Sequence, residues 1–191
     1  MKLKLSLLLL IPLFLSGCAS WHYSKTEKGQ LKGKIIVEWL EPEKFRFVPD
    51  SNDPFTFVRS NGEQITPGEM ITDGGSIPRP VRVFRHYSPW GYTPAFIIHD
   101  WIFRMKYCKL DGYENYDVDK AATIMSEVMK TMMEATVEKD KDAMYFMYEA
   151  VKTAPVKKIW REGRCGQSKM MTKSKKTPIY TFEIDAGKLS D

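Results

Sequence analysis

The sequence predicts an α+β fold in which a small antiparallel sheet in the N-terminal half precedes about three packed helices and a basic C-terminal tail. Early in the chain, short runs of aromatic and β-branched residues alternate with turn residues, which indicates strands. Later, apolar residues recur every three or four positions, which indicates helices. With 191 residues, 43% of them hydrophobic, the chain can form one core, and its 28% of charged residues excludes a polytopic membrane protein.

Residues 1–17 are predicted to be a signal peptide. Lys2 and Lys4 begin it, and the apolar stretch of 11 residues from Leu5 to Leu15 is shorter than the roughly 20 residues that a membrane-spanning helix needs. The sequence Leu15-Ser16-Gly17-Cys18 resembles the lipobox of bacterial lipoproteins, which implies a mature chain that starts at a lipid-modified Cys18. Similarity to Gram-negative lipoproteins implies, from Ala19, the outer membrane facing the periplasm. An ordinary signal with a chance cysteine is the alternative.

The mature chain is predicted to start with a polar tether, 18–33, and to continue as a single globular domain, 34–164. The predicted strands of this domain are Ile35–Leu40, Lys44–Val48 and Phe55–Val58. After them, the glycines and prolines of Thr72–Pro80 exclude regular structure. Loops of this kind often carry functional residues, so this segment is a place to look for a site.

Three helices are predicted next. Thr93 can cap the first, Pro94 fits its first position, and it continues from Ala95 to about Tyr107. The second begins near Asp117, and the third covers about Asp140 to Thr153 and ends before Pro155. The tail, 165–191, is rich in lysine, and the alternation around Tyr180–Ile184 is that of a possible edge strand.

Charge and cysteines indicate the compartment and the partners. Export exposes a protein to oxidising conditions, under which Cys108 and Cys165 could form one disulfide. The segment 157–176 carries eight basic residues and one acidic residue, so the rest of the mature chain is net negative and offers no broad basic face for nucleic acid. The predicted partners are therefore the membrane, through the lipid anchor and the basic tail, and an envelope substrate or envelope protein.

His99 and Asp100 are the residues best suited to chemistry. They lie next to each other on the first predicted helix, about 100° apart, so their side chains do not easily share a hydrogen bond but can reach two edges of one cleft. A histidine there could act as a general base near neutral pH. The alternative is a core imidazole whose aspartate neighbour has a structural role.

The Thr72–Arg79 string followed by Ala95–Phe103 resembles the domain of unknown function 1353 family, which is common in phages and prophages. That family combines a T-D-G-A-S-I-P-R loop, an apolar helix with H-D, an acidic helix and a Tyr-Ala-Val…Trp ending, here Tyr148–Val151 and Trp160. The resemblance spans roughly Ile35 to Trp160. Gly75 replaces an alanine, and Ala122 stands at the position of a family aspartate, for which Asp119 is a possible substitute.

A looser resemblance to secreted calcium-dependent phospholipases, which also place H-D on a helix after a glycine-rich loop, implies roles for individual residues. His99 would be the base, Asp100 with the backbone of Gly74 and Gly75 would hold a divalent cation, calcium first, and Asp117 or Asp119 would orient the imidazole. The flanking cysteines of those enzymes are missing here. Asp73 completes the candidate catalytic set, and Ser76 and Arg79 of the same loop are secondary candidates.

Two functions follow from these observations. The first is an envelope-anchored, metal-assisted hydrolase of phospholipid or peptidoglycan that uses His99, Asp100 and Asp73. The second is a non-catalytic binding lipoprotein, for superinfection exclusion or inhibition of an envelope enzyme, in which the same residues form a structural hydrogen-bond network.

Overall fold

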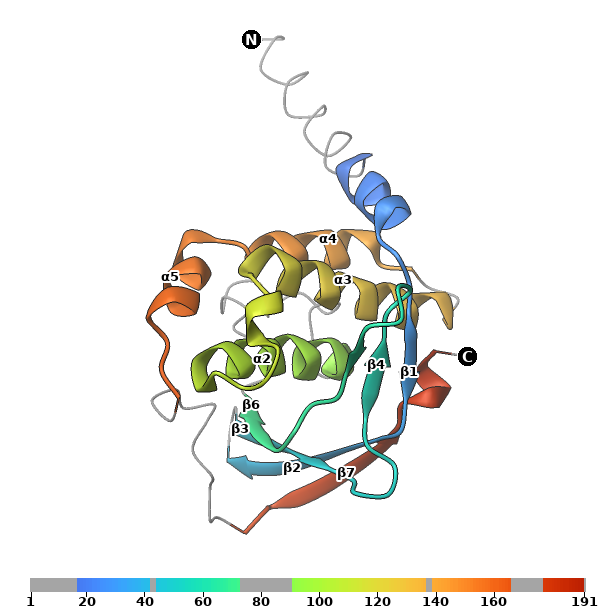
Figure 1. Cartoon of the computed structure of the whole chain (residues 1–191). Helices are drawn as coiled ribbons and strands as arrows, with labels where there is room; N and C mark the ends of the chain where they lie inside the picture. The colour runs from blue at the N-terminus through green and yellow to red at the C-terminus, as the bar shows by residue number, and fades with distance from the viewer. Residues whose placement is uncertain (1–16, 42–43, 73–90, 137–138, 166–176, 191) are drawn as a thin grey trace, which may run out of the picture.

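The computed structural model describes residues 17–41, 44–72, 91–136, 139–165 and 177–190. Its helices stack in layers over the strands, with α2 lying between the sheets and the pair α3 and α4 (Figure 1). The architecture is α+β, as the sequence predicts.

The strands form two antiparallel sheets where the sequence predicts one. A three-stranded sheet has the order β1-β4-β5, and a four-stranded sheet has the order β6-β3-β2-β7. The bounds of the strands are β1 Gln30–Lys32, β2 Lys34–Glu41, β3 Lys44–Pro49, β4 Thr56–Val58, β5 Gln64–Ile65, β6 Met70–Thr72 and β7 Tyr180–Asp185. The three predicted strands correspond to β2, β3 and β4. The short strands β1, β5 and β6 were not predicted, because none of them lies in a run of four aromatic and β-branched residues, as β4 does at Phe55–Val58.

Gly33 lets the chain pass from one sheet to the other. It separates β1 from β2 and has a φ of +79°, in the region that favours glycine. A Cβ atom there would lie 2.3 Å from the carbonyl oxygen of Pro54. The corner therefore requires glycine both for its backbone angle and for the close approach of a second backbone.

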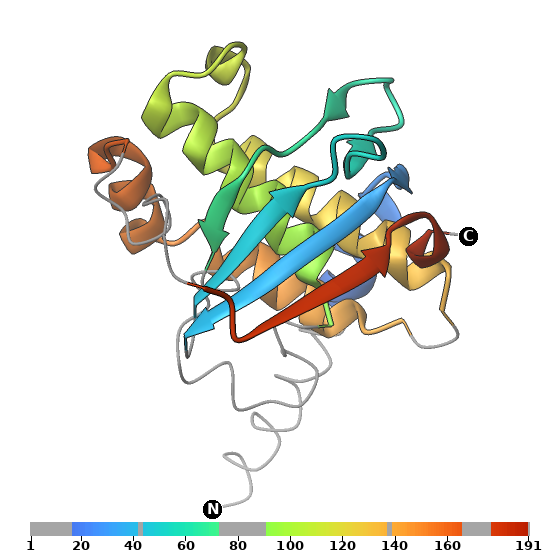
Figure 2. The same cartoon turned by 90° about the horizontal axis from the view of Figure 1, so that it is seen from below.

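The C-terminal strand β7 confirms the predicted edge strand. It pairs antiparallel with β2, with Tyr180 opposite Trp39 and Ile184 opposite Ile35. Figure 2 shows it in red along one border of the four-stranded sheet. The C-terminal segment thus completes the sheet beside a strand far earlier in the sequence: Lys34 pairs with Asp185, 151 residues later.

Four α-helices of the described residues lie between β6 and β7 in the sequence. They are α2 Thr93–Cys108, α3 Val118–Glu134, α4 Lys141–Ala150 and α5 Ala154–Glu162. Asp117 and Asp140 cap α3 and α4 by accepting hydrogen bonds from the backbone N–H groups of Lys120 and Ala143, both at 2.8 Å or less. Thr93 is not a cap, since it is already helical and follows Tyr92. The third predicted helix does end before Pro155, but Pro155 itself lies in the first turn of a further helix, α5, which the sequence did not predict.

One continuous core holds these layers together. The apolar α2 buries residues around most of its circumference, since it has the sheets on one side and α3 on the other. The methionines of α3 lie in this core, as expected for packing residues. Among its fully buried side chains are Phe47, Phe57, Ile97, Ile98, Ile102, Met125 and Met129.

The segment 18–33 is not a tether. Residues 17–25 are helical and pack on α3 and α4, with Ala19 and Tyr23 buried, and β1 follows. The segment was predicted to be a tether because it is polar overall. A few residues that face the domain, among them Ala19 and Tyr23, are nevertheless enough to hold it. No helix among the described residues has the length and apolar character needed to cross a bilayer.

Candidate active site around His99 and Asp100

The middle of α2 places His99 and Asp100 inside the domain. Their exposed fractions are 4% and 6%, in a helix whose neighbours Ile97, Ile98 and Ile102 are fully buried. Adjacent histidine and aspartate residues in such surroundings lose hydration that their partners must replace. The two residues differ in the hydrogen bonds that replace this hydration.

Asp100 is held by the end of a strand. The hydroxyl of Thr72, the last residue of β6, donates a 2.6 Å hydrogen bond to Oδ2 of Asp100. Oδ1 lies 3.5 Å from Nδ1 of His99, within range of an ion pair if the imidazole is protonated. Burial, and after it the charge of Asp100, raises the pKa of the Tyr107 hydroxyl. Asp100 therefore interacts electrostatically with both His99 and Tyr107.

His99 has an aromatic environment. Its ring packs on Phe103 with the centroids 4.7 Å apart, and Phe103 meets Trp160 edge-on at 4.8 Å. Both ring nitrogens are buried without a hydrogen-bond partner in the part of the chain that the structure describes. Buried side-chain nitrogens are seldom left in this state, and an unpaired imidazole beside a carboxylate is available to bind or deprotonate a ligand.

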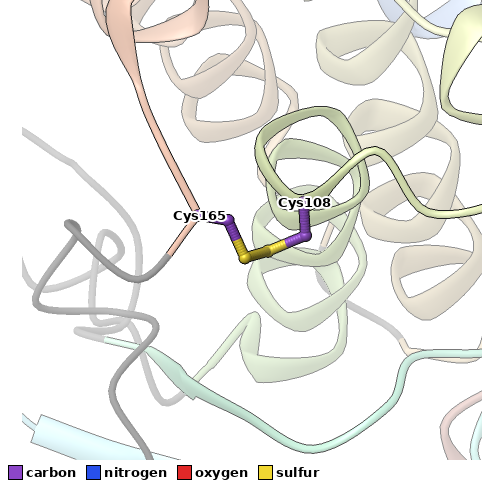
Figure 3. Close-up of a disulfide and its surroundings, with 2 residues drawn as sticks. All are labelled: Cys108 and Cys165. Atoms are coloured by element: carbon purple, nitrogen blue, oxygen red, sulfur yellow. A yellow bond between two sulfur atoms is a disulfide. The ribbon is translucent and has the colours of Figure 1, made fainter.

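The ends of α2 and α5 are joined beside this site. Cys108, at the end of α2, forms a disulfide with Cys165, a bond that the sequence left open (Figure 3). The hydroxyl of Tyr107 donates a 3.1 Å hydrogen bond to the carbonyl of Ile159. Close packing at Gly163, where a Cβ would lie 2.2 Å from the Tyr107 ring, completes the contact. These links hold Trp160 of α5 against Phe103, and Phe103 in turn packs against the ring of His99.

The loop residues predicted to share the site, Asp73, Gly74, Gly75, Ser76 and Arg79, lie outside the described residues. The described chain reaches the T-D-G-G-S-I-P-R string only at Thr72, which is bonded to Asp100. This bond joins the first residue of the string to α2. The string and the H-D pair on α2 are the two motifs that the sequence indicates for the site.

The other predicted carboxylates lie elsewhere. Asp117 caps α3 at the surface, and Asp119 has a side chain that is 60% exposed, with its nearest ion-pair partner, Lys157, 3.9 Å away. Neither is a hydrogen-bond partner of His99, so the structure does not support the prediction that one of them orients the imidazole. Asp119 therefore does not replace the carboxylate missing at Ala122, which is fully buried.

A divalent cation finds few ligands in the described residues. Calcium takes 6 to 8 oxygen ligands. Asp100 supplies one carboxylate, which already accepts the Thr72 hydrogen bond, and no three His, Cys, Asp or Glu side chains of the described ranges gather in metal-binding geometry. These residues alone do not supply the ligands that the ion needs.

Sequence reasoning missed the partners of the pair and one buried ion cluster. Phe103 lies one helical turn after His99 on α2, so the sequence places it beside the site, whereas Trp160 of α5 becomes its neighbour only through folding. Glu127 is 4% exposed and receives two 2.7 Å hydrogen bonds from Arg59. A signal for this pair was present, because a glutamate on the buried face of α3 needs a cation.

Comparison with known proteins supports the two motifs. Searches of curated proteins and of solved structures found no significant match. The family described as "Protein of unknown function (DUF1353)" matches residues 52–151, a narrower span than Ile35–Trp160. The matched range contains β4 to β6, residues 73–90, and α2 to α4, and so includes both motifs. On this match over more than half of its residues, the chain belongs to the DUF1353 family.

Proposed function

We propose that this chain is an envelope-anchored, phage-type lipoprotein that hydrolyses phospholipid or peptidoglycan with His99 as its general base. The observation that carries the proposal is the buried imidazole of His99, which has no hydrogen-bond partner in the described chain and lies 3.5 Å from Asp100. A histidine with a purely structural role normally has its nitrogens paired, because an unsatisfied buried polar group costs about 1–3 kcal/mol. Retaining such a group is easier to explain if a ligand or water pairs it during function.

The anchor in this proposal is Cys18, with the inner face of the outer membrane as its location. Support comes from the lipobox-like Leu15–Cys18 and from the exposure of Cys18 in the folded chain. The Cys108–Cys165 disulfide agrees with export, since such bonds persist in oxidising compartments. The basic segment 157–176 would add contact with anionic headgroups.

In the proposed reaction, a ring nitrogen of His99 takes a proton from water while the water oxygen attacks the carbonyl carbon of an ester or amide. Asp100, at 3.5 Å, stabilises the imidazolium that forms. The imidazolium then gives its proton to the departing alkoxide or amine, so that one water is consumed and one bond is cleaved. Asp73 and a calcium ion held by Asp100, Gly74 and Gly75 remain proposed additions, for which a calcium-dependent rise in melting temperature is the test.

A second function, binding without catalysis, is favoured by one observation. The 2.6 Å bond between Thr72 and Asp100 ties a strand end to α2, as a structural network would. In this alternative the lipoprotein blocks phage entry or inhibits an envelope enzyme.

The substitution His99→Leu separates the two functions. The proposal expects the mature protein to hydrolyse phospholipid or peptidoglycan, and expects His99→Leu to abolish turnover while keeping or raising the melting temperature, because it removes two unpaired buried nitrogens. Ile98→Ala is the control for damage to α2, with an expected loss of about 2–5 kcal/mol. Full turnover by His99→Leu would contradict the catalytic role, and a clear loss of stability would favour the binding function.

A further inference from the structure

The helix at 17–25 and the chain that leads from it to β1 are held on the domain by several contacts. The ring of His22 packs on Tyr148 with the centroids 4.2 Å apart, and its Nε2 lies 3.3 Å from the hydroxyl of Ser126. The ammonium group of Lys130 donates hydrogen bonds of 3.0 and 2.8 Å to the carbonyls of Tyr23 and Thr26. Further along, the N–H of Gly29 donates to the hydroxyl of Thr131 at 2.8 Å. No free spacer remains between residue 18 and β1.

This attachment determines where a lipid on Cys18 would leave the protein. Cys18 is exposed and lies one helical turn before His22, whose ring is 5.7 Å from that of Tyr145 in α4. Figure 1 shows residues 17–25 beside α4 at one end of the molecule. An acyl chain on Cys18 would therefore hold this end of the domain directly at the bilayer surface.

The same end carries exposed aromatic side chains. Trp21, three residues after Cys18 and so on the same side of the helix, is 65% exposed. Phe146 of α4 is 41% exposed, and its ring centroid lies 6.3 Å from that of the half-buried Tyr145. We call the surface formed by Cys18, Trp21, Tyr145 and Phe146 the Cys18 face. Tryptophan and tyrosine concentrate at the boundary between lipid and water, where an amphipathic ring has both environments.

We propose that the Cys18 face lies in the interfacial layer of the bilayer, so that the domain is held in one fixed orientation against the membrane. This inference rests on the proposed acylation of Cys18 and adds to it an orientation and a set of contact residues. The occupant is the lipid surface itself, because the anchor at Cys18 lies on the same side of its helix as the exposed Trp21 and one helical turn before His22, which packs near Tyr145.

Charge plays little part in this contact. Glu149, next to the Cys18 face, lies 3.5 Å from Lys152, and Lys141 lies over the ring of Tyr23 at 5.1 Å. These three groups carry one negative and two positive charges, far fewer unpaired positive charges than the basic segment 157–176. Binding through the Cys18 face should be insensitive to salt and should need no anionic lipid, whereas binding through the basic segment should weaken as salt rises.

The test uses the lipidated mature protein in phosphatidylcholine vesicles that contain brominated lipid, which quenches tryptophan at the interface. Mass spectrometry first establishes acylation, with Cys18→Ser as the control that must lose it. We expect bromolipid to quench part of the emission, Trp21→Phe to abolish that quenching, and Trp39→Phe, a change at an exposed tryptophan of β2, to keep it. For the unlipidated Cys18→Ser protein, Phe146→Ser should weaken vesicle binding by about tenfold, and Tyr180→Ser should not.

The outcomes separate the two levels of the proposal. An unmodified Cys18 would overturn the anchor, and with it the basis of the orientation. An acylated protein whose quenching does not depend on Trp21 would leave the anchor intact and overturn the orientation. Trp21 emission that shifts with protein concentration without lipid would show that a second copy, rather than the membrane, covers the Cys18 face.

Discussion

The hydroxyl of Thr72 donates a 2.6 Å hydrogen bond to Oδ2 of Asp100, and both residues are more than nine-tenths buried. This bond connects the end of β6 with the middle of α2 across 28 residues of sequence. It is the described link between the two motifs that define the candidate site.

Replacing Thr72 with valine tests this link. The change keeps the shape of the side chain but leaves a buried carboxylate oxygen without its donor, so we expect a loss of about 1–3 kcal/mol in the free energy of unfolding. Urea denaturation measures it. The control is Thr66→Val, at an exposed threonine whose hydroxyl pairs with that of Thr56, with an expected change within about 0.5 kcal/mol. Equal effects of the two substitutions would show that the Thr72–Asp100 bond adds no stability.

The long elements of the fold could be predicted, whereas those that depend on contacts could not. In α3 the apolar positions recur over 17 residues, and Asp117 marks its start, so the pattern alone is sufficient. In β5 only Gln64 and Ile65 pair with β4, and nothing local distinguishes them from a turn. The helix at 17–25 was missed for a related reason, because His22 and Tyr23 find their partners on α3 and α4.

The candidate site was partly visible in the sequence for the opposite reason. His99 and Asp100 break the apolar pattern of α2, and a polar pair in a core helix is a local inconsistency that indicates function or a buried partner. The partners themselves are not local: Thr72 comes from β6, and Trp160, which backs Phe103, comes from the unpredicted α5. Sequence patterns therefore located the pair without its surroundings.

The Cys108–Cys165 disulfide is expected to stabilise the junction of α2 and α5. It closes a loop of 57 residues, for which the restricted entropy of the unfolded chain corresponds to about 4 kcal/mol. We expect the double change Cys108→Ser and Cys165→Ser to lower the free energy of unfolding by about 2–4 kcal/mol in guanidinium titrations. Cys18→Ser is the matched control, since Cys18 is exposed and unpaired, and it should unfold like the parent. A double variant as stable as the parent would contradict the stabilising role.

The buried pair of Arg59 and Glu127 is expected to be the most sensitive ionic contact in the described chain. Arg59 donates two 2.7 Å hydrogen bonds to Glu127 and one of 2.6 Å to Glu63, which joins the hairpin of β4 and β5 to α3. Arg59→Met leaves Glu127, which is 4% exposed, as a buried charge without its cation. We expect this change to lower the free energy of unfolding by about 3–5 kcal/mol.

Two further variants test the origin of that cost. Adding Glu127→Met to Arg59→Met should recover much of the lost free energy of unfolding, because the stranded charge is then gone. Lys158→Met removes an exposed partner that lies 3.9 Å from Glu162 and should change stability by less than about 1 kcal/mol. A double variant no more stable than Arg59→Met would show that the loss comes from packing and not from the unpaired charge.

Acid should release the N-terminal helix through Glu134. Hydrogen bonds from Lys139 and then from the hydroxyl of Tyr23 lower the pKa of Glu134 from 4.5 to about 2. A carboxyl group with a lowered pKa contributes stability that is complete above its unfolded value, so this contribution should be lost as the pH falls from 4.5 towards 2. Burial also lowers the pKa of His22 from 6.5, although the charge of Glu149 opposes this shift. Protonation of His22 is therefore easier when the helix is released, so the attachment also weakens as the pH falls below 6.5.

Hydrogen exchange of residues 17–26, followed as a function of pH, measures this release. In Glu134→Gln the side chain still accepts the hydrogen bond from Tyr23 but no longer titrates, so protection of the helix should fall less steeply between pH 4.5 and 2 than in the parent. Glu162→Gln is the control, because its side chain is 64% exposed and lies 3.9 Å from Lys158. Identical pH profiles for the parent and Glu134→Gln would show that another group controls the attachment, with His22 the first to test by substitution.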